Sequence, residues 1–273
     1  MRNGKKCEKV CARIAKMLSY NEQRYTGGRV VVNIIIQARM GSTRLPGKTM
    51  MDVCGKPLLY YSVFRSKLSK YADNVIVATT NDPKDDVIVK WCEENEIPYY
   101  RGSEEDVLDR YYKAAIRFNS DVIVRVTSDC PFADPEIIDM LILIQKNFDY
   151  DYVSNRIKKR TWPHGLDVEV FTMESLERAW KEAKAQPERE HVTPYIMSHP
   201  EKFKVHEVPY TEDLSHVRLT VDYKEDFEMA KELMRILIEK FGENFSWKDI
   251  LKIYEKNTDI FEINKGKINT KLI

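Results

Sequence analysis

The chain has 273 residues, of which 43% are hydrophobic and 32% charged, and its formal net charge is +1. This length and composition are typical of one globular domain with short additions. The small net charge argues against a general nucleic-acid binder, and no apolar run approaches the roughly 20 residues of a membrane span. Five scattered cysteines are typical of a reducing compartment, so we expect a cytoplasmic protein with free thiols.

The first 29 residues differ in composition from the rest of the chain. They carry eight Lys or Arg and only two Asp or Glu, and one short amphipathic stretch runs from Val10 to Leu18. They lack the apolar core of a signal peptide. We therefore predict a basic N-terminal extension over residues 1–29 that the fold does not need. An organelle-targeting leader is the less favoured alternative.

Between residues 30 and 126 the sequence alternates between β-branched runs and helical patterns. The runs are nearly continuous in apolar residues, as in strands buried on both faces of a parallel sheet. The predicted strands are Val30–Ile36, Asn74–Thr79 and Asp121–Val126, and the predicted helices are Leu58–Ser69, Asp86–Asn95 and Val107–Phe118. This alternation predicts an α/β fold with a mostly parallel sheet.

After Asp134 the alternation becomes less regular. Asp134 followed by Pro135 predicts the N-cap and first turn of a helix that runs to Asn147. Further predicted strands are Tyr152–Ser154, Leu166–Thr172, Lys204–Val208 and Val217–Val221, and further helices are Glu174–Lys184, Glu190–Met197, Glu225–Phe241 and one from Ser246. We expect this half to extend the sheet and add a lobe, giving a domain over residues 30–258 and a tail over 259–273.

The segment from Gln37 to Lys48 directly follows the first predicted strand. It contains two Arg, one Lys, two Gly and two hydroxyl side chains. Glycines let backbone N–H groups approach a phosphate, and the cations neutralise its charge, so we predict a phosphate-binding loop. It is not a Walker A loop, because five residues separate Gly41 from Gly47 where that motif has four, and one of them is Pro46.

The pattern Ala38-Arg39-x-x-Ser42-x-Arg44-Leu45-Pro46-Gly47-Lys48 resembles the signature of the sugar-acid cytidylyltransferases, which include the CMP-KDO and CMP-acylneuraminate synthetases. The longer form from Gln37 is most similar to the spore coat polysaccharide biosynthesis protein F family. The resemblance covers residue 32 to about residue 255. It implies a three-layer nucleotide-diphospho-sugar transferase fold, related to glycosyltransferase A. It also implies a Mg²⁺-dependent reaction with CTP, release of pyrophosphate, and a homodimer.

Two aspartates stand where a metal site is expected. Asp129 follows the third predicted strand, Asp121–Val126, and Asp222 directly follows the predicted strand Val217–Val221. Magnesium bound to a triphosphate is held by one or two carboxylates plus phosphate oxygens, and the resembled family has metal-binding aspartates at both positions. The alternatives are a turn residue at Asp129 and a helix capping box of Asp222 with Glu225. The sequence Asp149-Tyr150-Asp151 spells a metal-binding DxD, but its place between a helix and a strand is typical of a turn.

Nucleotide contacts are expected in the loop and beyond it. The resemblance places the base contacts at residues 78–81, after the second predicted strand, and at residues 101–106. The predicted nucleotide-binding residues are Gln37, Ala38, Arg39, Gly41, Ser42, Arg44, Lys48, Thr79, Thr80, Asn81, Ser103 and Asp106. Ser103 and Asp106 also form a plausible capping pair for the next helix, and the sequence does not separate the two roles.

Two polar clusters in the second half resemble the acceptor side of the same family. Residues 162–171 and 188–195 combine aromatic, histidine and charged side chains, from which we predict acceptor contacts by His164, Asp167, Glu169, Arg189 and His191. Arg189 suits an anionic acceptor because a guanidinium binds carboxylate or phosphate bidentately. The alternative is a set of surface salt bridges.

Together these features predict cytidylyl transfer from CTP to an anionic sugar or sugar-acid-like acceptor. Arg39, Arg44, Lys48 and Asp129 are the predicted catalytic residues, and Asp129 and Asp222 the predicted Mg²⁺ ligands. Two alternatives stay open within enzymes: transfer of another nucleotide, and glycosyl transfer from a nucleotide sugar. The alternative outside enzymes is a nucleotide-binding module without chemistry.

Overall fold

A computed structural model of the chain describes residues 29–266. The prediction of a basic extension therefore lies, apart from Arg29, outside the described residues. The strands are β1 Val32–Gln37, β2 Asp52–Val53, β3 Lys56–Pro57, β4 Asn74–Thr80, β5 Tyr99–Gly102, β6 Val122–Thr127, β7 Tyr152–Ser154, β8 Glu169–Thr172 and β9 Val205–Glu207.

The helices follow the strands closely in the first half and form a separate group at the end. The α-helices are α2 Leu58–Lys67, α3 Asp86–Glu94, α4 Val107–Arg117, α5 Pro135–Phe148, α6 Met173–Glu182, α7 Gln186–His191, α8 Pro194–Ser198, α9 Lys224–Phe241, α10 Trp247–Lys256 and α11 Thr258–Glu262. Two short 3-10 turns, Lys48–Met50 and Pro83–Asp85, complete the set. Among the described residues no helix is long and apolar enough to cross a membrane.

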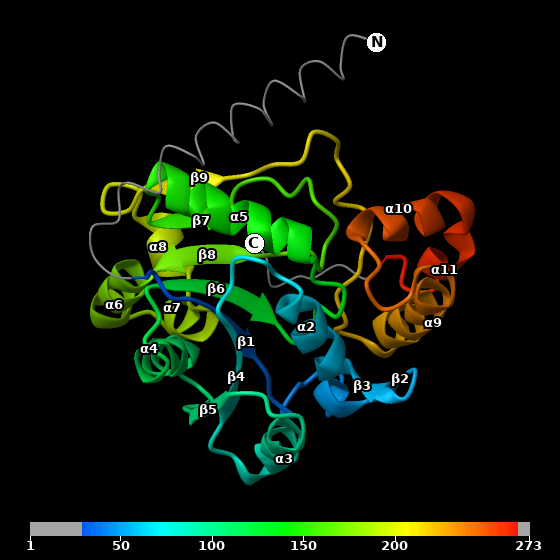
Figure 1. Cartoon of the computed structure of the whole chain (residues 1–273), viewed down its shortest axis with the longest axis horizontal. Helices are drawn as coiled ribbons and strands as arrows, with labels where there is room; N and C mark the ends of the chain where they lie inside the picture. Colours follow the sequence, from blue (N-terminus) through cyan, green and yellow to red (C-terminus); the bar gives the residue numbers. More distant parts are fainter. Residues whose placement is uncertain (1–28, 267–273) are drawn as a thin grey trace.

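Seven strands form one sheet in the order β5-β4-β1-β6-β8-β7-β9. β1 lies inside the sheet and pairs in parallel with β4 and β6. β8 is antiparallel to both β6 and β7, so the sheet is mostly parallel with one reversed strand. Figure 1 shows α9, α10 and α11 gathered as a lobe on the side toward which β6 points.

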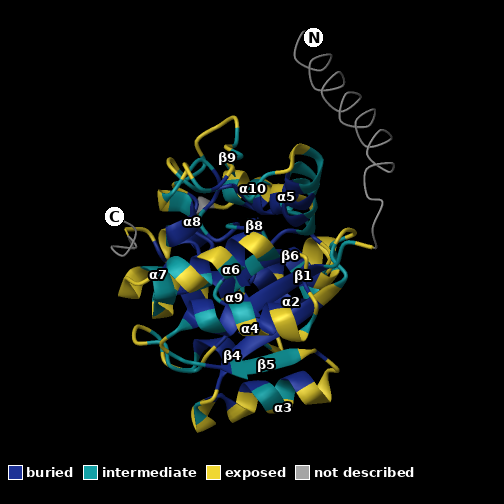
Figure 2. Ribbon diagram, turned by 90° about the vertical axis from the view of Figure 1, so that its left-hand side faces the viewer, coloured by how far each residue is buried: buried dark blue, intermediate teal, exposed yellow. Residues whose placement is uncertain are grey.

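Alternate residues of β1 enter two different cores. Ile34 and Ile36 belong to a cluster that includes residues of α2, α3, α5, α9 and α10, whereas Ile35 packs with residues of α4, α6 and α8. Because side chains alternate across a strand, the apolar run supplies both faces of the sheet. Helices therefore cover the sheet on two sides, which confirms the predicted three-layer α/β fold, and Figure 2 shows the central strands buried between them.

One predicted strand does not form, and another is shorter than expected. Val217–Val221 forms no strand and contributes only a bridge between His164 and Arg218. The predicted strand from Leu166 begins only at Glu169. The Asn155 side chain donates a hydrogen bond to the carbonyl of residue 166 and accepts one from the backbone N–H of residue 168. The side-chain amide thus replaces the ladder hydrogen bonds of a neighbouring strand.

The predicted helix Glu190–Met197 is divided into α7 and α8. Val192 has a φ of 73°, and Pro194 opens α8. The positive φ of Val192 ends the helical backbone of α7, and Pro194 takes the first turn of α8, where its missing N–H costs no hydrogen bond. At the other end of the domain, the buried Asn264 donates to the Arg218 carbonyl at 3.3 Å and to Asp226 at 3.0 Å, so residue 264 still packs against the domain, and the boundary at residue 258 stays a prediction.

Asp134 connects three elements and gives a test of the fold. It caps α5 as predicted, accepts a hydrogen bond from the Trp247 backbone at 2.8 Å, and pairs with the fully buried Arg65. Asp134→Ala leaves a buried guanidinium without its carboxylate, so we expect a loss of about 3–5 kcal/mol in the free energy of unfolding. Chemical denaturation measures it.

The matched control is Glu136→Ala, in the first turn of α5, which removes an exposed ion pair with Lys248 of α10. We expect this change to cost under about 1 kcal/mol. Equal losses of stability in the two variants would contradict the prediction that the buried contacts of Asp134 stabilise the fold.

Candidate active site

The site forms where the central strands end. Gln37 and Thr127, the last residues of β1 and β6, are directly paired. The loop after β6 carries Asp129, whose carbonyl accepts a hydrogen bond from the Val221 backbone at 2.8 Å. This contact brings Asp222, 93 positions later in the chain, to the same edge of the sheet.

Lys48 lies between the two aspartates. Its Nζ is 3.3 Å from Asp129 Oδ2 and 3.2 Å from Asp222 Oδ1, and it donates to the Val221 carbonyl at 2.6 Å. Lys48 is only 8% exposed, so this ammonium is almost entirely removed from solvent. The first loop, the end of β6 and the segment before α9 therefore meet at one nitrogen atom.

Asp222 receives two further cations. Arg44 Nη2 is 2.9 Å from its Oδ1, and Arg218 Nη2 is 3.3 Å from its Oδ2. The capping box that opens α9 is made by Asp226, which accepts from the backbone N–H groups of Asp222 and Tyr223 at 3.0 Å. The helix begins at Lys224 with Tyr223 as its N-cap, and the Asp222 carboxylate faces the site.

The charges of this cluster stabilise one another. Burial lowers the pKa of Lys48, but Asp129 and Asp222 more than offset this, and the pKa of the amine stays above its usual value. For Asp129, burial raises the pKa, but the neighbouring Lys48 more than reverses this shift, so the pKa of this carboxyl lies below its usual range. Lys48 is protonated and Asp129 ionised at neutral pH.

The loop from Ala38 to Gly47 is held in a defined conformation. The Met40 backbone donates to Asp85 at 2.7 Å, Thr49 Oγ1 donates to the Arg39 carbonyl at 2.8 Å, and Arg39 pairs with Glu104 at 3.1 Å. Gly47 has a φ of 75°, in the region that favours glycine. A side chain at Gly41 would meet Glu104 at 2.8 Å. Gly47 thus meets a backbone requirement of the loop, whereas Gly41 is close only to the end of a flexible side chain.

Two cavities, each of about 220 Å³, open beside the Lys48 cluster. We name the first the loop cavity. It is lined by Gln37, Ala38, Arg39, Ser42, Thr43, Arg44, Lys48, Thr49, Val107, Arg110, Thr127, Ser128, Asp129, Glu190, His191 and Asp222. It therefore brings together most of the predicted loop residues and both aspartates.

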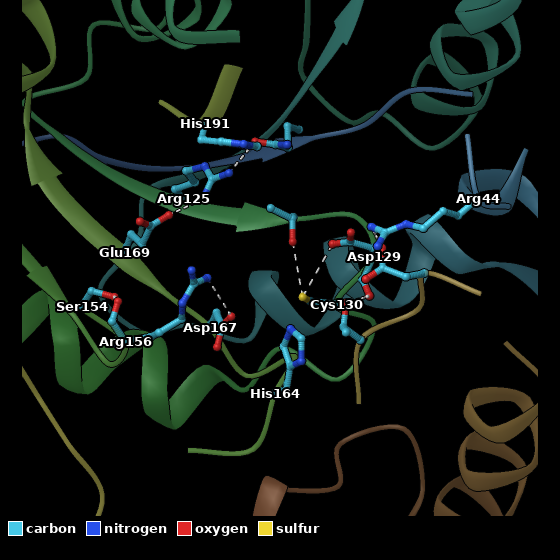
Figure 3. A pocket seen from close by; sticks show the side chains of 14 residues that line it. Arg44, Arg125, Asp129, Cys130, Ser154, Arg156, His164, Asp167, Glu169 and His191 are labelled. Atoms are coloured by element: carbon cyan, nitrogen blue, oxygen red, sulfur yellow. Dashed lines mark hydrogen bonds and ion pairs between the residues drawn. The ribbon is translucent and has the colours of Figure 1, made fainter. Parts of the chain in front are cut away.

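We name the second the His164 cavity, shown in Figure 3. It is lined by Gln37, Arg44, Arg125, Thr127, Asp129, Cys130, Ser154, Arg156, His164, Asp167, Glu169, His191, Thr220 and Asp222. Six of these residues also line the loop cavity, so the two cavities are neighbours across Asp129 and Asp222.

Ion pairs organise the floor of the His164 cavity. Glu169 pairs with Arg125 and accepts hydrogen bonds from Tyr152 and Thr193, both at 2.6 Å. Although burial raises the pKa of Glu169, the neighbouring Arg125 brings it below its usual value. Asp167 pairs closely with Arg160, and Arg156 lies 3.5 Å away on its other side. Burial, followed by Arg160, lowers the pKa of His164 to about 4. The cavity thus presents carboxylates, guanidinium groups and a neutral imidazole.

Several predicted contact residues lie outside the lining of both cavities. Asp106 caps α4, accepting from Asp109 at 2.9 Å, and Ser103 Oγ accepts from the Asp106 backbone at 3.0 Å. Arg189 pairs with Asp106 and donates to the Trp180 carbonyl at 2.8 Å. Thr80 is hydrogen-bonded to Asp85, Thr79 is fully buried, and the Asn81 backbone donates to the Gly102 carbonyl at 3.0 Å. Nucleotide and acceptor contacts at these positions stay predictions.

The Asp149-Tyr150-Asp151 sequence is a turn, as expected. Asp149 ends α5 with a φ of 53°, and its carboxylate is 90% exposed. Asp151 directly precedes β7, whereas Ser154 at the other end of that strand lines the His164 cavity. The DxD sequence therefore lies at the opposite edge of the sheet from the candidate site.

Sequence reasoning missed several residues that line the cavities. Arg125 is the clearest, because a charged side chain in the middle of the apolar strand Val122–Thr127 is a signal in itself. Arg110 and Arg156 carry no such signal, since they lie in a helix and a loop where charges are common. In the part of the chain that the structure describes, no group of three or more His, Cys, Asp or Glu is arranged to hold a metal ion.

The chain belongs to the cytidylyltransferase family, whose model matches residues 33–268. It is 42% identical over 238 residues to an uncharacterized protein of Methanocaldococcus jannaschii, covering 85% of this chain and 93% of that protein. It is 37% identical over 238 residues to the spore coat polysaccharide biosynthesis protein SpsF of Bacillus subtilis, covering 82% of this chain and 94% of the relative. The resemblance drawn from the loop motif is confirmed.

A solved structure supports the same assignment. A cytidylyltransferase from Leptospira borgpetersenii superposes with a TM-score of 0.81 at 36% identity, covering 88% of this chain and all of the other. The nucleotide-diphospho-sugar transferase fold predicted from the sequence is thereby confirmed. The Lys48 cluster and the two cavities lie within the matched region.

The lowered pKa of His164 predicts a pH dependence of stability. Its pKa is about 4 in the folded chain and about 6.5 in an unfolded one, so the unfolded state binds more protons between these values. The neutral imidazole contributes stability above pH 6.5, and this is lost as the pH falls toward 4. We expect a contribution of up to about 3 kcal/mol, measured by chemical denaturation across this range.

His164→Gln removes the titrating group, so its stability should decline less between pH 6.5 and 4 than that of the unaltered protein. His216→Gln, at an exposed position, is the matched control and should retain the full decline. Parallel curves for His164→Gln and the unaltered protein would refute the assignment.

Proposed function

We propose that this protein transfers CMP from CTP to an anionic sugar or sugar-acid acceptor and releases pyrophosphate, in the synthesis of a surface polysaccharide or glycan precursor. The observation that carries the proposal is the Lys48–Asp129–Asp222 cluster at the boundary of two cavities. One cavity is lined by the loop that resembles a triphosphate site, and the other by polar groups suited to a sugar. A group-transfer enzyme needs such a pair of adjoining sites.

On the nucleotide side, Arg39, Arg44 and Lys48 bind the phosphates. Each is paired with a carboxylate in the structure, so the loop cavity is charged but nearly balanced. A bound triphosphate competes for these cations, and the carboxylates of Asp129 and Asp222 can then bind another cation. Carboxylate oxygens are the protein ligands that Mg²⁺ prefers, together with phosphate oxygens.

The donor set fits a magnesium ion. The carboxylates of Asp129 and Asp222 converge on one point, now held by the Lys48 amine. Since the described residues offer no group of three or more such ligands, phosphate oxygens and water would have to complete the coordination of a bound ion. When bound, the ion would neutralise charge on the α-phosphate. The Lys48 amine supplies a second positive charge to the phosphates.

On the acceptor side, Arg156 is better placed than Arg189 to contact an anionic group. Arg189 is held by Asp106 outside the cavity lining, whereas Arg156 lines the His164 cavity and is 37% exposed. Arg125, by contrast, is committed to Glu169. His164, Asp167, Glu169 and His191 line the same cavity, so they remain our proposed acceptor contacts.

In the proposed reaction an acceptor oxygen attacks the α-phosphorus in line. A bond forms between this oxygen and phosphorus, the bond to the pyrophosphate oxygen breaks, and the acceptor loses its proton to solvent. Catalysis comes mainly from positioning and from neutralisation of charge. The test is a pyrophosphate-release screen of four nucleoside triphosphates against anionic sugars with Mg²⁺.

The same screen separates the alternatives. Transfer of another nucleotide would give pyrophosphate with a triphosphate other than CTP. A glycosyltransferase using a nucleotide sugar would give none with any of them. Tight CTP binding without turnover would favour a non-catalytic module. The homodimer implied by the resemblance stays a prediction, which light scattering tests.

Removal of one charge from the cluster gives a direct test of its role. Asp129→Asn and Lys48→Ala should each lower the rate of CTP-dependent pyrophosphate release by at least about 10²–10³-fold, because charge stabilisation in the transition state is lost. Steady-state kinetics on folded protein, checked by circular dichroism, measures the change.

Asp149→Asn is the matched control, since it alters an exposed aspartate of the DxD sequence at the other edge of the sheet. Its rate should equal that of the unaltered protein. A near-normal rate for Asp129→Asn would remove Asp129 from the catalytic residues, and a large loss for Asp149→Asn would move the metal site to the DxD sequence.

A further inference from the structure

Arg110 is the exception among the cations of the loop cavity. Arg39, Arg44 and Lys48 each lie within 4 Å of a carboxylate. Arg110 is 1% exposed, and among residues 29–266 no carboxylate lies within that distance of its guanidinium. A buried charge without a partner is costly, so an arginine in this state inside a cavity indicates a missing ligand.

The hydrogen bonds of Arg110 leave one edge of its guanidinium unused. Nη1 donates to the Ser103 carbonyl at 2.6 Å, which fixes the side chain against the loop before α4. Nε is buried without a hydrogen-bond partner, and Nη2 has none within the described part of the chain. Nε–H and Nη2–H form the two prongs of a planar fork, which binds two adjacent acceptors.

The backbone makes room for this side chain. A Cβ placed on Gly102, at the end of β5, would lie 3.0 Å from Arg110 Cγ. Val107, one turn earlier on α4, lines the loop cavity beside Arg110 and offers an apolar surface. An apolar wall next to a fixed pair of donors suits a nucleobase better than a phosphate.

The position of Arg110 in the sheet also favours the base. Asp129 follows β6, and Gly102 ends β5, three strands away, which corresponds to about 14 Å at the usual strand spacing. A nucleotide with its phosphates at the Lys48–Asp129–Asp222 cluster extends its nucleoside toward β4 and β5. Arg110 stands at that end of the cavity.

We propose that Arg110 recognises cytosine by donating to its adjacent acceptors O2 and N3, an inference that rests on the proposed function. Uracil carries a hydrogen on N3, and an arginine has no acceptor to receive it. Arg110 therefore makes the enzyme prefer CTP to UTP. A bidentate arginine contact to a base discriminates by about 5- to 150-fold, which sets the expected preference.

The experiment measures the dissociation constants of CTP and UTP by titration calorimetry for the full chain and its variants. We expect the unaltered protein to prefer CTP at least about fivefold, and Arg110→Met to bind the two nucleotides equally. Arg110→Lys keeps the charge without the fork, so it too should lose the preference, and it serves if Arg110→Met does not fold. Arg117→Met, at an exposed position on α4, is the control and should keep the preference.

The outcomes separate the two proposals. If the unaltered protein prefers CTP and Arg110→Met retains its CTP to UTP ratio, the role of Arg110 is overturned while the proposed function stands. A uniform loss of affinity for both nucleotides at an unchanged ratio overturns it as well, because that result indicates a phosphate contact or support of the loop. If the unaltered protein binds no CTP, both the proposed function and this inference fail.

Discussion

An ammonium ion shared by two carboxylates links the parts of this structure on which the site depends. Lys48 comes from the first loop, Asp129 from the end of β6, and Asp222 from the segment before α9. One carboxylate oxygen of each aspartate lies within 3.3 Å of the Lys48 Nζ. Each group would be costly to bury alone, and together they compensate one another. If the loop after β1 moved away from the segment before α9, these charges would lose their partners.

The same principle of compensation extends outward from the cluster. Arg218 joins Asp222 to Asp226, and Asp226 in turn opens α9 and receives Asn264. The last described part of the chain thus supports the site through two intermediates. In the His164 cavity, Glu169 and Asp167 are likewise matched with arginines. Such pairs hold the side chains of the site in place, and side chains ordered in advance lose less entropy on binding.

This arrangement gives the cations different tasks. In the proposed function, Arg39, Arg44 and Lys48 exchange their carboxylate partners for phosphate groups, whereas other arginines keep their partners and hold the protein frame. Arg189 belongs to the frame, because its guanidinium is taken up by Asp106 and the backbone of residue 180. Residue type alone does not distinguish a clamp for a ligand from a clamp for the protein, since both use the same chemistry.

The sequence by itself determined the mostly parallel sheet and the family, and it predicted a phosphate-binding loop. These depend on local patterns: β-branched runs specify buried strands, and the spacing of Arg39, Arg44 and Lys48 lies within one segment. Only the tertiary structure decided that Asp226 forms the capping box of α9, that Val217–Val221 forms a bridge rather than a strand, and that Arg110 has no carboxylate partner among residues 29–266. These facts depend on which distant groups meet, and side-chain partners from far along the chain leave no local periodicity to read.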